Sequence, residues 1–411
     1  MCVEHVGRPG TGQSRRVLVV VAPGQGAQSP GFLTPWLESP VFASRLQWLS
    51  AVSGLDLAHY GTEADAETIR DTAVAQPLLV ASALLVALEL FPHPADAFSR
   101  IGAVAGHSVG ELAAAAGARA ITAEQAMVLV RERGVAMAAA ARTTTTSMTA
   151  VLGGDRQQVL EALEKHGLTP ANDNGPGQIV AAGTVEQLAA FADDAPARAR
   201  LMPLSVAGAF HTEHMAPAVD VLAGLARSVS THDARIPVIS NRDGQIVHDG
   251  KDLLRRIVSQ VRSPVRWDLC METMLDLGVT GILEVPPAGT LTGIAKRNMK
   301  GVETFALKTP DQLDDAHAFI DKHGDASQLD TNPTWRMLVA PSKGTFHQMA
   351  DLAEGSSIAP DQRVGAVAGR QDETAVTAPY GGTIVEWLVE DGDLVSPGQP
   401  LIRLHPEGVP S

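Results

Sequence analysis

The chain has 411 residues, enough for two or three domains of about 150 residues each. Hydrophobic residues make up 45% and charged residues 19%, a balance that excludes a disordered or fibrous protein. The formal net charge of -14 excludes the basic surface typical of nucleic-acid-binding proteins. Aromatic residues are only 4%, and the high alanine and valine content favours a helix-rich α/β enzyme.

Cysteine usage and hydropathy indicate the compartment. The two cysteines, Cys2 and Cys270, cannot build a disulfide framework or a zinc site, so we expect a reducing, cytoplasmic location. The longest apolar stretch, Leu78–Leu90, is interrupted and shorter than the roughly 20 residues of a membrane span. Residues 1–16 are polar and lack the apolar segment of a signal peptide, so they are interpreted as a tail or an upstream start.

The first third of the chain alternates between strands, turns and helices. Val17–Ala22 is a short apolar run, typical of a strand buried on both faces, and it ends at the glycine-rich turn Pro23–Gln28. Gly102–Ala105 predicts a second such strand. This alternation indicates an α/β body with a hydrolase-like parallel sheet. The predicted helices are Thr72–Leu90, Glu111–Arg119 and Ala123–Arg142, the last capped by Thr122.

Residues 143–206 show a different order of elements. Apolar runs and helical patterns follow one another there as β-α-β-β-α-β, which is the ferredoxin-like order. We therefore expect a ferredoxin-like subdomain inserted into an α/β domain that spans residues 16–325. The body then resumes with the expected elements Thr212–Leu225, Pro237–Asn241, Leu253–Val261, Leu269–Leu277 and Gly281–Val285.

The C-terminal fifth differs in composition from the rest. Residues 326–411 hold 5 basic and 11 acidic side chains, a net charge of -6. A linker is predicted over 326–337, because the segment there is polar and contains a proline. Residues 338–405 are short apolar pieces separated by glycine and proline, which predicts an all-β module. Within it, Glu390–Asp393 is predicted to be a turn between two strands of alternating polarity.

A glycine-flanked serine follows the second predicted strand. Gly106–Gly110 matches the G-x-S-x-G pattern, in which the serine projects from a sharp turn and the glycines permit the strained backbone. The helix that follows offers free backbone N–H groups to a developing oxyanion. The context favours Ser108 as a catalytic nucleophile over a structural serine.

A serine nucleophile needs a base and substrate-binding groups. His211 is the candidate base because it follows a strand end, although it could equally be a surface histidine. His107 is interpreted as a supporting group and His214 as exposed. Arg133 lies among alanine, valine and methionine, so it is either an ion-paired surface arginine or a buried guanidinium that binds a carboxylate. Arg131 competes for that second role.

Together these residues resemble the malonyl-CoA:acyl-carrier-protein transacylase family and the related acyltransferase domains of polyketide synthases. The resemblance covers about residues 16–310 and rests on a series of ordered motifs rather than on one serine turn. These motifs are Gly24–Gln28, Gln76–Pro77, Gly106–Glu111, Arg133–Gly134, Asn174–Gln178, Phe210–His211, Gln260, Ser263–Val265 and Leu291–Gly293.

The resemblance implies a role for each site residue. Ser108 would be the acylated nucleophile, His211 its base, and Arg133 the group that holds the malonyl carboxylate. The backbone N–H groups of Gln25 and Val109 would form the oxyanion hole. The remaining site residues would be Phe210, which favours malonyl over branched acyl groups, Gln260, which orients the histidine through its main chain, and the supporting Asn174 and Asn241.

The implied reaction is ping-pong acyl transfer, for fatty-acid or polyketide synthesis. Malonyl-CoA would acylate the serine, and the phosphopantetheine thiol of an acyl carrier protein would then attack the ester. Glu284–Gly289 departs from the Gly-Pro-Gly turn that the family often has, because Pro286 restricts the backbone there. Carrier proteins of this kind are generally acidic, and the basic candidates for docking them are Arg255, Arg256, Arg262, Lys296 and Arg297.

Residues 338–405 resemble a biotinyl/lipoyl domain. The motifs are Ala378–Ile384, Glu390–Val395 and Pro397–Leu401. Such domains carry the cofactor on a lysine at a hairpin tip. That tip falls here at Arg370–Asp372, where Gln371 takes the lysine position, and the only lysine of the module is Lys343. We therefore expect no covalently bound cofactor and a role in docking or assembly.

Two alternative functions remain open from the sequence. A thioesterase or lipase shares the serine turn but needs an acid between serine and histidine in chain order. A non-catalytic assembly scaffold with a lipoyl-like end is the second alternative. Neither a metal site nor a membrane or nucleic-acid partner is expected. The acids that could serve a hydrolase all fall in the predicted subdomain and are Asp155, Asp173, Asp193 and Asp194.

Overall fold

A computed structural model of the chain describes residues 16–406, except for 205, 207, 329–335, 370–371 and 380. The chain divides after residue 330 into two compact units, and each is described by itself. This division falls within the segment 326–337 that the sequence predicts as a linker. The tail before Arg16, with Cys2, and the hairpin-tip position Gln371 lie outside the described residues.

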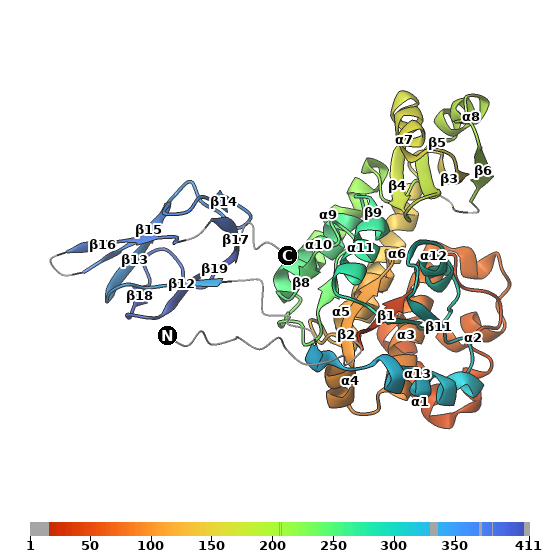
Figure 1. Cartoon of the computed structure of the whole chain (residues 1–411), viewed down its shortest axis with the longest axis horizontal. Helices are drawn as coiled ribbons and strands as arrows, with labels where there is room; N and C mark the ends of the chain where they lie inside the picture. Colours follow the sequence, from red (N-terminus) through yellow and green to blue (C-terminus); the bar gives the residue numbers. More distant parts are fainter. Residues whose placement is uncertain are drawn as a thin grey trace, which may run out of the picture. The chain divides into compact units, whose positions relative to one another are not determined.

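A six-stranded sheet forms the centre of the first unit (Figure 1). Its strand order is β11-β10-β1-β2-β7-β8, and every neighbouring pair runs parallel except β7 and β8. β1 and β2 are buried along nearly their whole length, as expected for strands covered on both faces. The strands are β1 (Leu18–Ala22), β2 (Ile101–Gly106), β7 (Val238–Ile239), β8 (Ile246–Val247), β10 (Gly281–Glu284) and β11 (Glu303–Ala306).

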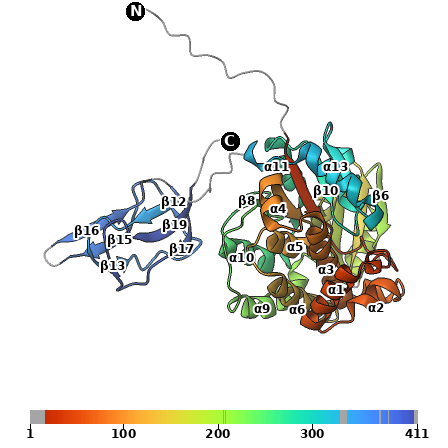
Figure 2. The same ribbon diagram turned by 90° about the horizontal axis from the view of Figure 1, so that it is seen from below.

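Helices cover both faces of this sheet (Figure 2). They are α1 (Pro40–Ser53), α2 (Leu57–Thr62), α3 (Thr72–Leu90), α4 (Pro94–Arg100), α5 (Gly110–Gly117), α6 (Ala123–Ala141), α9 (Ala216–Ala226), α10 (Gly250–Gln260), α11 (Trp267–Asp276), α12 (Thr290–Asn298) and α13 (Leu313–His323). Alternate side chains of β1 point to opposite faces. Leu18 and Ala22 join the core that contains α3, α5 and α6, whereas Val19 and Val21 join the core that contains α11 and α12.

Helix α3 runs through the first of these cores, over the residues predicted from the sequence. Among the described residues it is the one helix whose length and composition would allow it to cross a membrane. The apolar helix is therefore longer than Leu78–Leu90, the stretch whose short length was the argument from sequence against a membrane span. However, 72% of its most apolar window is buried inside the protein, against α5 and α6 among other elements. This burial identifies α3 as a core helix.

A smaller antiparallel sheet follows α6. Its elements are β3 (Thr146–Gly153), α7 (Arg156–Lys165), β4 (Thr169–Asp173), β5 (Gln178–Thr184), α8 (Val185–Asp193) and β6 (Ala199–Pro203). The order β6-β3-β5-β4 is ferredoxin-like, and β9 (Val265–Arg266) adds a parallel strand beside β4. β6 ends at Pro203, before the end of the predicted segment 143–206, and the Val206 N–H donates to Leu204 O.

The loop after β10 contains the departure from the Gly-Pro-Gly turn. Glu284 is fully buried, and its carboxylate accepts hydrogen bonds from the backbone N–H groups of Gly289, Leu291 and Thr292 at 2.9, 3.0 and 2.8 Å. A carboxylate at this position also complements the positive N-terminal end of α12. One buried acid therefore organises the turn, so its geometry does not depend on a flexible glycine at Pro286.

The described part of the second unit is all-β. Its strands are β12 (Arg336–Val339), β13 (Gly344–Gln348), β14 (Ser357–Ile358), β15 (Arg363–Ala368), β16 (Glu373–Thr377), β17 (Gly382–Trp387), β18 (Leu394–Val395) and β19 (Pro400–Pro406). They form two antiparallel four-stranded sheets, β12-β19-β17-β14 and β16-β15-β13-β18, around the buried Phe346, Val367 and Ile384. The predicted turn at Glu390–Asp393 is present between β17 and β18. These two strands pair with different partners in different sheets, so the turn connects the sheets.

Candidate active site

The predicted serine turn lies at the carboxyl end of β2. β2 ends at Gly106, Ser108 has a φ of 55°, and α5 begins at Gly110. A Cβ on Gly106 would lie 1.9 Å from the Gly110 carbonyl carbon, and a Cβ on Gly110 would lie 2.4 Å from the carbonyl oxygen of Ala22. Both glycines are therefore required by close backbone contacts, and together they hold the serine in a conformation that is uncommon outside glycine.

His211 meets this serine from a distant part of the chain. Its Nε2 lies 2.9 Å from Ser108 Oγ, and its Nδ1 lies 2.9 Å from the main-chain oxygen of Gln260. A carbonyl oxygen only accepts, so Nδ1 carries the proton and Nε2 is free to accept from the serine hydroxyl. Burial, together with the nearby charge of Arg133, lowers the pKa of His211 to about 3. The imidazole is therefore neutral and able to take a proton.

The sequence left open whether Arg133 is an ion-paired surface arginine or a buried guanidinium, and the structure shows that it is buried. It is 2% exposed, and it donates to Gln76 Oε1 at 2.7 Å, to Ser108 Oγ at 3.3 Å and to Gln260 Oε1 at 3.4 Å. Burial lowers its pKa to about 10, which leaves it charged at neutral pH. All three partners are uncharged. Arg131, in contrast, is half-buried and donates to the backbone oxygen of Ala73.

Asn241 connects the serine turn to the other site residues. Its Oδ1 accepts from the Ser108 N–H at 2.7 Å and from Gln260 Nε2 at 2.9 Å. Its Nδ2 donates to the Gly106 carbonyl at 2.8 Å. The side chain is fully buried. A single amide at the end of β7 thus fixes both the backbone of the nucleophile and the glutamine that holds the base.

The remaining predicted residues are placed around this centre. His107 Nε2 lies 3.0 Å from Asn174 Oδ1, so the β4–β5 turn of the small subdomain supports the residue beside the serine. Phe210 is buried next to the base. His214 is half-buried and not exposed as predicted, because its N–H donates to Thr212 Oγ1 and folds it into a tight turn.

Two backbone N–H groups are available near the serine. Among the described residues, those of Gln25 and Val109 donate to no other group. Val109 follows the serine directly and is buried. The side-chain oxygen of Gln25 accepts from Gln76 Nε2 at 3.4 Å, which links this loop to the arginine.

The sequence missed the functional position of two polar residues. Gln76 joins Arg133 to Gln25, and Glu111 accepts the Asn241 N–H at 2.7 Å. Both are 1% exposed, and burial raises the pKa of Glu111 to about 8. The sequence signal that could have found them is a polar side chain in a mostly apolar helix: Glu111 is the one polar side chain of α5, and Gln76 is one of a few in α3. Among the described residues, no group of three or more His, Cys, Asp or Glu is placed to hold a metal ion.

Comparison with known proteins agrees with this geometry. Residues 19–322 match the family described as the acyl transferase domain. The chain is 50% identical to the malonyl CoA-acyl carrier protein transacylases of Mycobacterium bovis and Mycobacterium tuberculosis over 299 residues, 73% of this chain and 99% of each relative. It is 33% identical to the transacylase of Bacillus subtilis, over 71% of this chain and 93% of that protein.

Solved structures give the same result. The crystal structure of MCAT from Mycobacterium tuberculosis matches with a TM-score of 0.71 at 49% identity, over 73% of this chain and 99% of that one. A malonyl-transacylase in complex with a type II PKS acyl-carrier protein matches with a TM-score of 0.69 at 30% identity, over 74% and 99%. The chain therefore belongs to the malonyl CoA-acyl carrier protein transacylase family, as its ordered motifs indicate.

Proposed function

We propose that this protein transfers a malonyl group from malonyl-CoA to the phosphopantetheine thiol of an acyl carrier protein, for fatty-acid or polyketide synthesis. The observation that carries the proposal is the Ser108–His211 contact of 2.9 Å with a buried cation, Arg133, 3.3 Å from the same hydroxyl. The first pair is a nucleophile with its base. The cation offers a binding group for the free carboxylate of a malonyl unit.

The reaction proceeds in two balanced half-reactions. Ser108 Oγ attacks the thioester carbonyl while His211 Nε2 takes the hydroxyl proton, and the carbon–sulfur bond breaks to release CoA, which receives that proton. The carrier thiol then gives its proton to His211 and attacks the seryl ester, which returns the hydroxyl to Ser108. The free N–H groups of Gln25 and Val109 stabilise the oxyanion in each step.

Two side chains determine which acyl group is accepted. Arg133 binds the malonyl carboxylate through its two terminal nitrogens, which displaces one or more of its neutral partners. Phe210 places a ring beside the base and leaves less room for an α-substituent. Burial of the charged end also keeps water from the ester, which favours a thiol acceptor over hydrolysis.

The decisive experiment is intact-mass analysis of the protein after incubation with malonyl-CoA. We expect the mass of one malonyl group to be added to the wild-type chain and none to Ser108→Ala. Ser147→Ala is the matched control, because this serine lies on β3 outside the site and should leave the adduct unchanged. An adduct that persists in Ser108→Ala would contradict the proposal.

The hydrolase alternative has less support. The base donates its Nδ1 proton to a main-chain oxygen, where a hydrolase triad uses a carboxylate. Of the subdomain acids, Asp173 pairs with Arg156, and Asp155 caps α7. Release of free malonate and transfer to a carrier protein can be measured in the same reaction. Faster hydrolysis than transfer would favour a thioesterase.

The candidates for carrier docking differ in exposure. Arg256 is buried and paired with Asp252 and Asp243, which removes it from the list, because a docking group must reach solvent. Arg255 also pairs with Asp252. Lys296 and Arg297 are exposed at the end of α12, and we infer that they contribute most to binding an acidic carrier.

We infer that the C-terminal unit is a biotinyl/lipoyl-like module without an attached cofactor. Two four-stranded antiparallel sheets and the β15–β16 hairpin, which leads to Gln371, support this reading. The module would then serve docking or assembly. The mass of the purified chain before substrate is added is the test, since a biotinyl or lipoyl adduct would contradict it. Buried, free Cys270 accords with a reducing, cytoplasmic location.

A further inference from the structure

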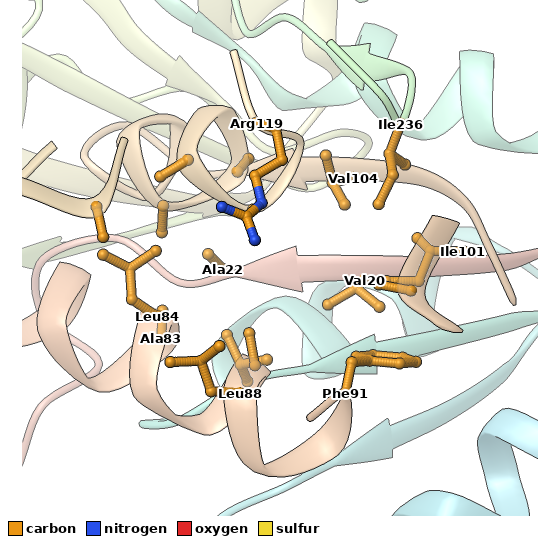
Figure 3. Close-up of a pocket in the computed structure, with 18 of the residues that line it drawn as sticks. Val20, Ala22, Ala83, Leu84, Leu88, Phe91, Ile101, Val104, Arg119 and Ile236 are labelled. Atoms are coloured by element: carbon orange, nitrogen blue, oxygen red, sulfur yellow. The ribbon is translucent and has the colours of Figure 1, made fainter. Parts of the chain in front are cut away.

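A cavity in the first unit is lined by none of the proposed catalytic residues. Its volume is about 430 Å³, and it lies between β1, β2 and the helices α3, α4 and α5 (Figure 3). This volume falls within the roughly 300–1,000 Å³ of small-molecule sites. Its walls are mostly aliphatic or aromatic and include Val20, Leu84, Leu88, Phe91, Ile101 and Val104.

One cation projects into this apolar space. The guanidinium of Arg119 points toward the middle of the lining side chains in Figure 3. Arg119 has a φ of 65°, and the next residue, Ala120, donates its N–H to Ala115 at the end of α5. The left-handed turn thus aims the side chain back over the cavity. Within the described part of the chain, this guanidinium has no hydrogen bond or ion pair.

The open side of the cavity is also apolar. Trp48 and Leu88 line it and are 49% and 39% exposed, which is unusual for such large hydrophobic side chains. The other charged wall residue is Glu124, an exposed acid at the start of α6. Its charge disfavours a dianionic ligand such as a phosphate monoester.

We propose that this cavity binds a single-chain fatty acid. The aliphatic chain lies along the walls formed by α3 and β1, and the carboxylate pairs with Arg119 at the open side. A fatty acid fits the two features of this cavity. Its aliphatic tail fits the long apolar surface, and its carboxylate fits the one unpaired cation. The proposal is independent of the reaction at Ser108.

Calorimetric titration of the full chain with hexanoate, octanoate and decanoate tests the proposal. We expect the affinity to rise about fourfold per added methylene until the cavity is filled. Decanol should bind about fivefold more weakly than decanoate, because the ion pair lies at an exposed site. Arg119→Gln should remove that difference, whereas Arg227→Gln, an exposed arginine outside the cavity, should retain it.

A blocking variant and a second ligand complete the test. Ala87 is half-buried on the wall, so Ala87→Trp should abolish decanoate binding while malonyl adduct formation continues. Binding of decanoyl-CoA without binding of decanoate would overturn the proposal, since the anchor would then not be the carboxylate. The absence of decanoate binding, equal binding of decanol, or unchanged binding in Ala87→Trp would overturn it as well.

Discussion

At the scale of single residues, the site is defined by a buried cation without a carboxylate partner. Arg133 forms hydrogen bonds only with neutral groups among the described residues. The charge of Glu111 raises the pKa of Arg133, but burial in turn raises the pKa of Glu111 to about 8, which weakens this compensation at neutral pH. The guanidinium therefore has no carboxylate bonded to it and can bind that of an anionic acyl group.

Removal of this charge should change the substrate preference. We expect Arg133→Gln to lower kcat/KM for malonyl-CoA by about 100-fold, which corresponds to the loss of a charged hydrogen bond. Acylation by acetyl-CoA should not fall, because acetyl has no carboxylate. Arg131→Gln, two residues away, is the control and should behave as wild type. Steady-state kinetics with both thioesters measure the effect, and a retained preference for malonyl would refute this role.

The base should show an unusual pH dependence. Burial lowers the pKa of His211 from 6.5 to about 3, so the imidazole stays neutral from pH 5 upward. We expect single-turnover acylation to be flat between pH 5 and 7, with no loss of rate centred near 6.5. The unfolded chain binds a proton near pH 6.5 and the folded chain does not. This residue therefore makes the protein less stable as pH falls from 6.5 toward 3. A fall in the acylation rate below a pKa near 6.5 would contradict the assignment of His211 as a buried, neutral base.

At the scale of elements, the strand-turn-helix unit β2–α5 presents the nucleophile. Ser108 adopts a positive φ between two glycines that touch neighbouring backbone. Asn241, at the end of the adjacent strand β7, then bonds to this turn. Because β2 and β7 run parallel, their carboxyl ends meet at one edge of the sheet, and residues distant in sequence converge there.

Two glycines of α5 should respond in opposite ways to the same substitution. Gly110→Ala places a Cβ 2.4 Å from the Ala22 oxygen, so we expect a loss of about 3 kcal/mol in unfolding free energy and a large drop in acylation. Gly117→Ala meets nothing within 4 Å and should stabilise by about 0.5 kcal/mol with normal activity. Denaturant unfolding and adduct formation measure both. A harmless Gly110→Ala would show that the turn tolerates a side chain.

At the scale of the whole molecule, the chain joins two units that each have a core of their own. The first holds one hydrophobic cluster on each side of its main sheet and a third in the ferredoxin-like subdomain, and the second holds a cluster between its two sheets. The family match ends at residue 322, within the first unit. The active-site residues described above all precede that point.

The first unit should therefore function without the second. We expect a chain that stops at residue 330 to fold and to transfer malonyl within about twofold of the full-length rate, because compact units of this kind fold on their own. Circular dichroism and the carrier-transfer assay provide the readouts. A soluble but inactive truncated chain would mean that the C-terminal unit takes part in catalysis.

Features set by short-range patterns could be predicted from the sequence alone. The buried strands, the capped helix α6, the ferredoxin-like order and the G-x-S-x-G turn depend on local periodicity and backbone preference, and the motifs identify the family. Only the tertiary structure decided which polar groups meet. Ser108 lies 103 residues from His211 and 133 from Asn241, so no local pattern specifies these contacts. Tertiary packing of the sheet edge and its helices likewise decides three other features. It buries Arg256, places Gln76 between Arg133 and Gln25, and brings Glu111 to the Asn241 N–H.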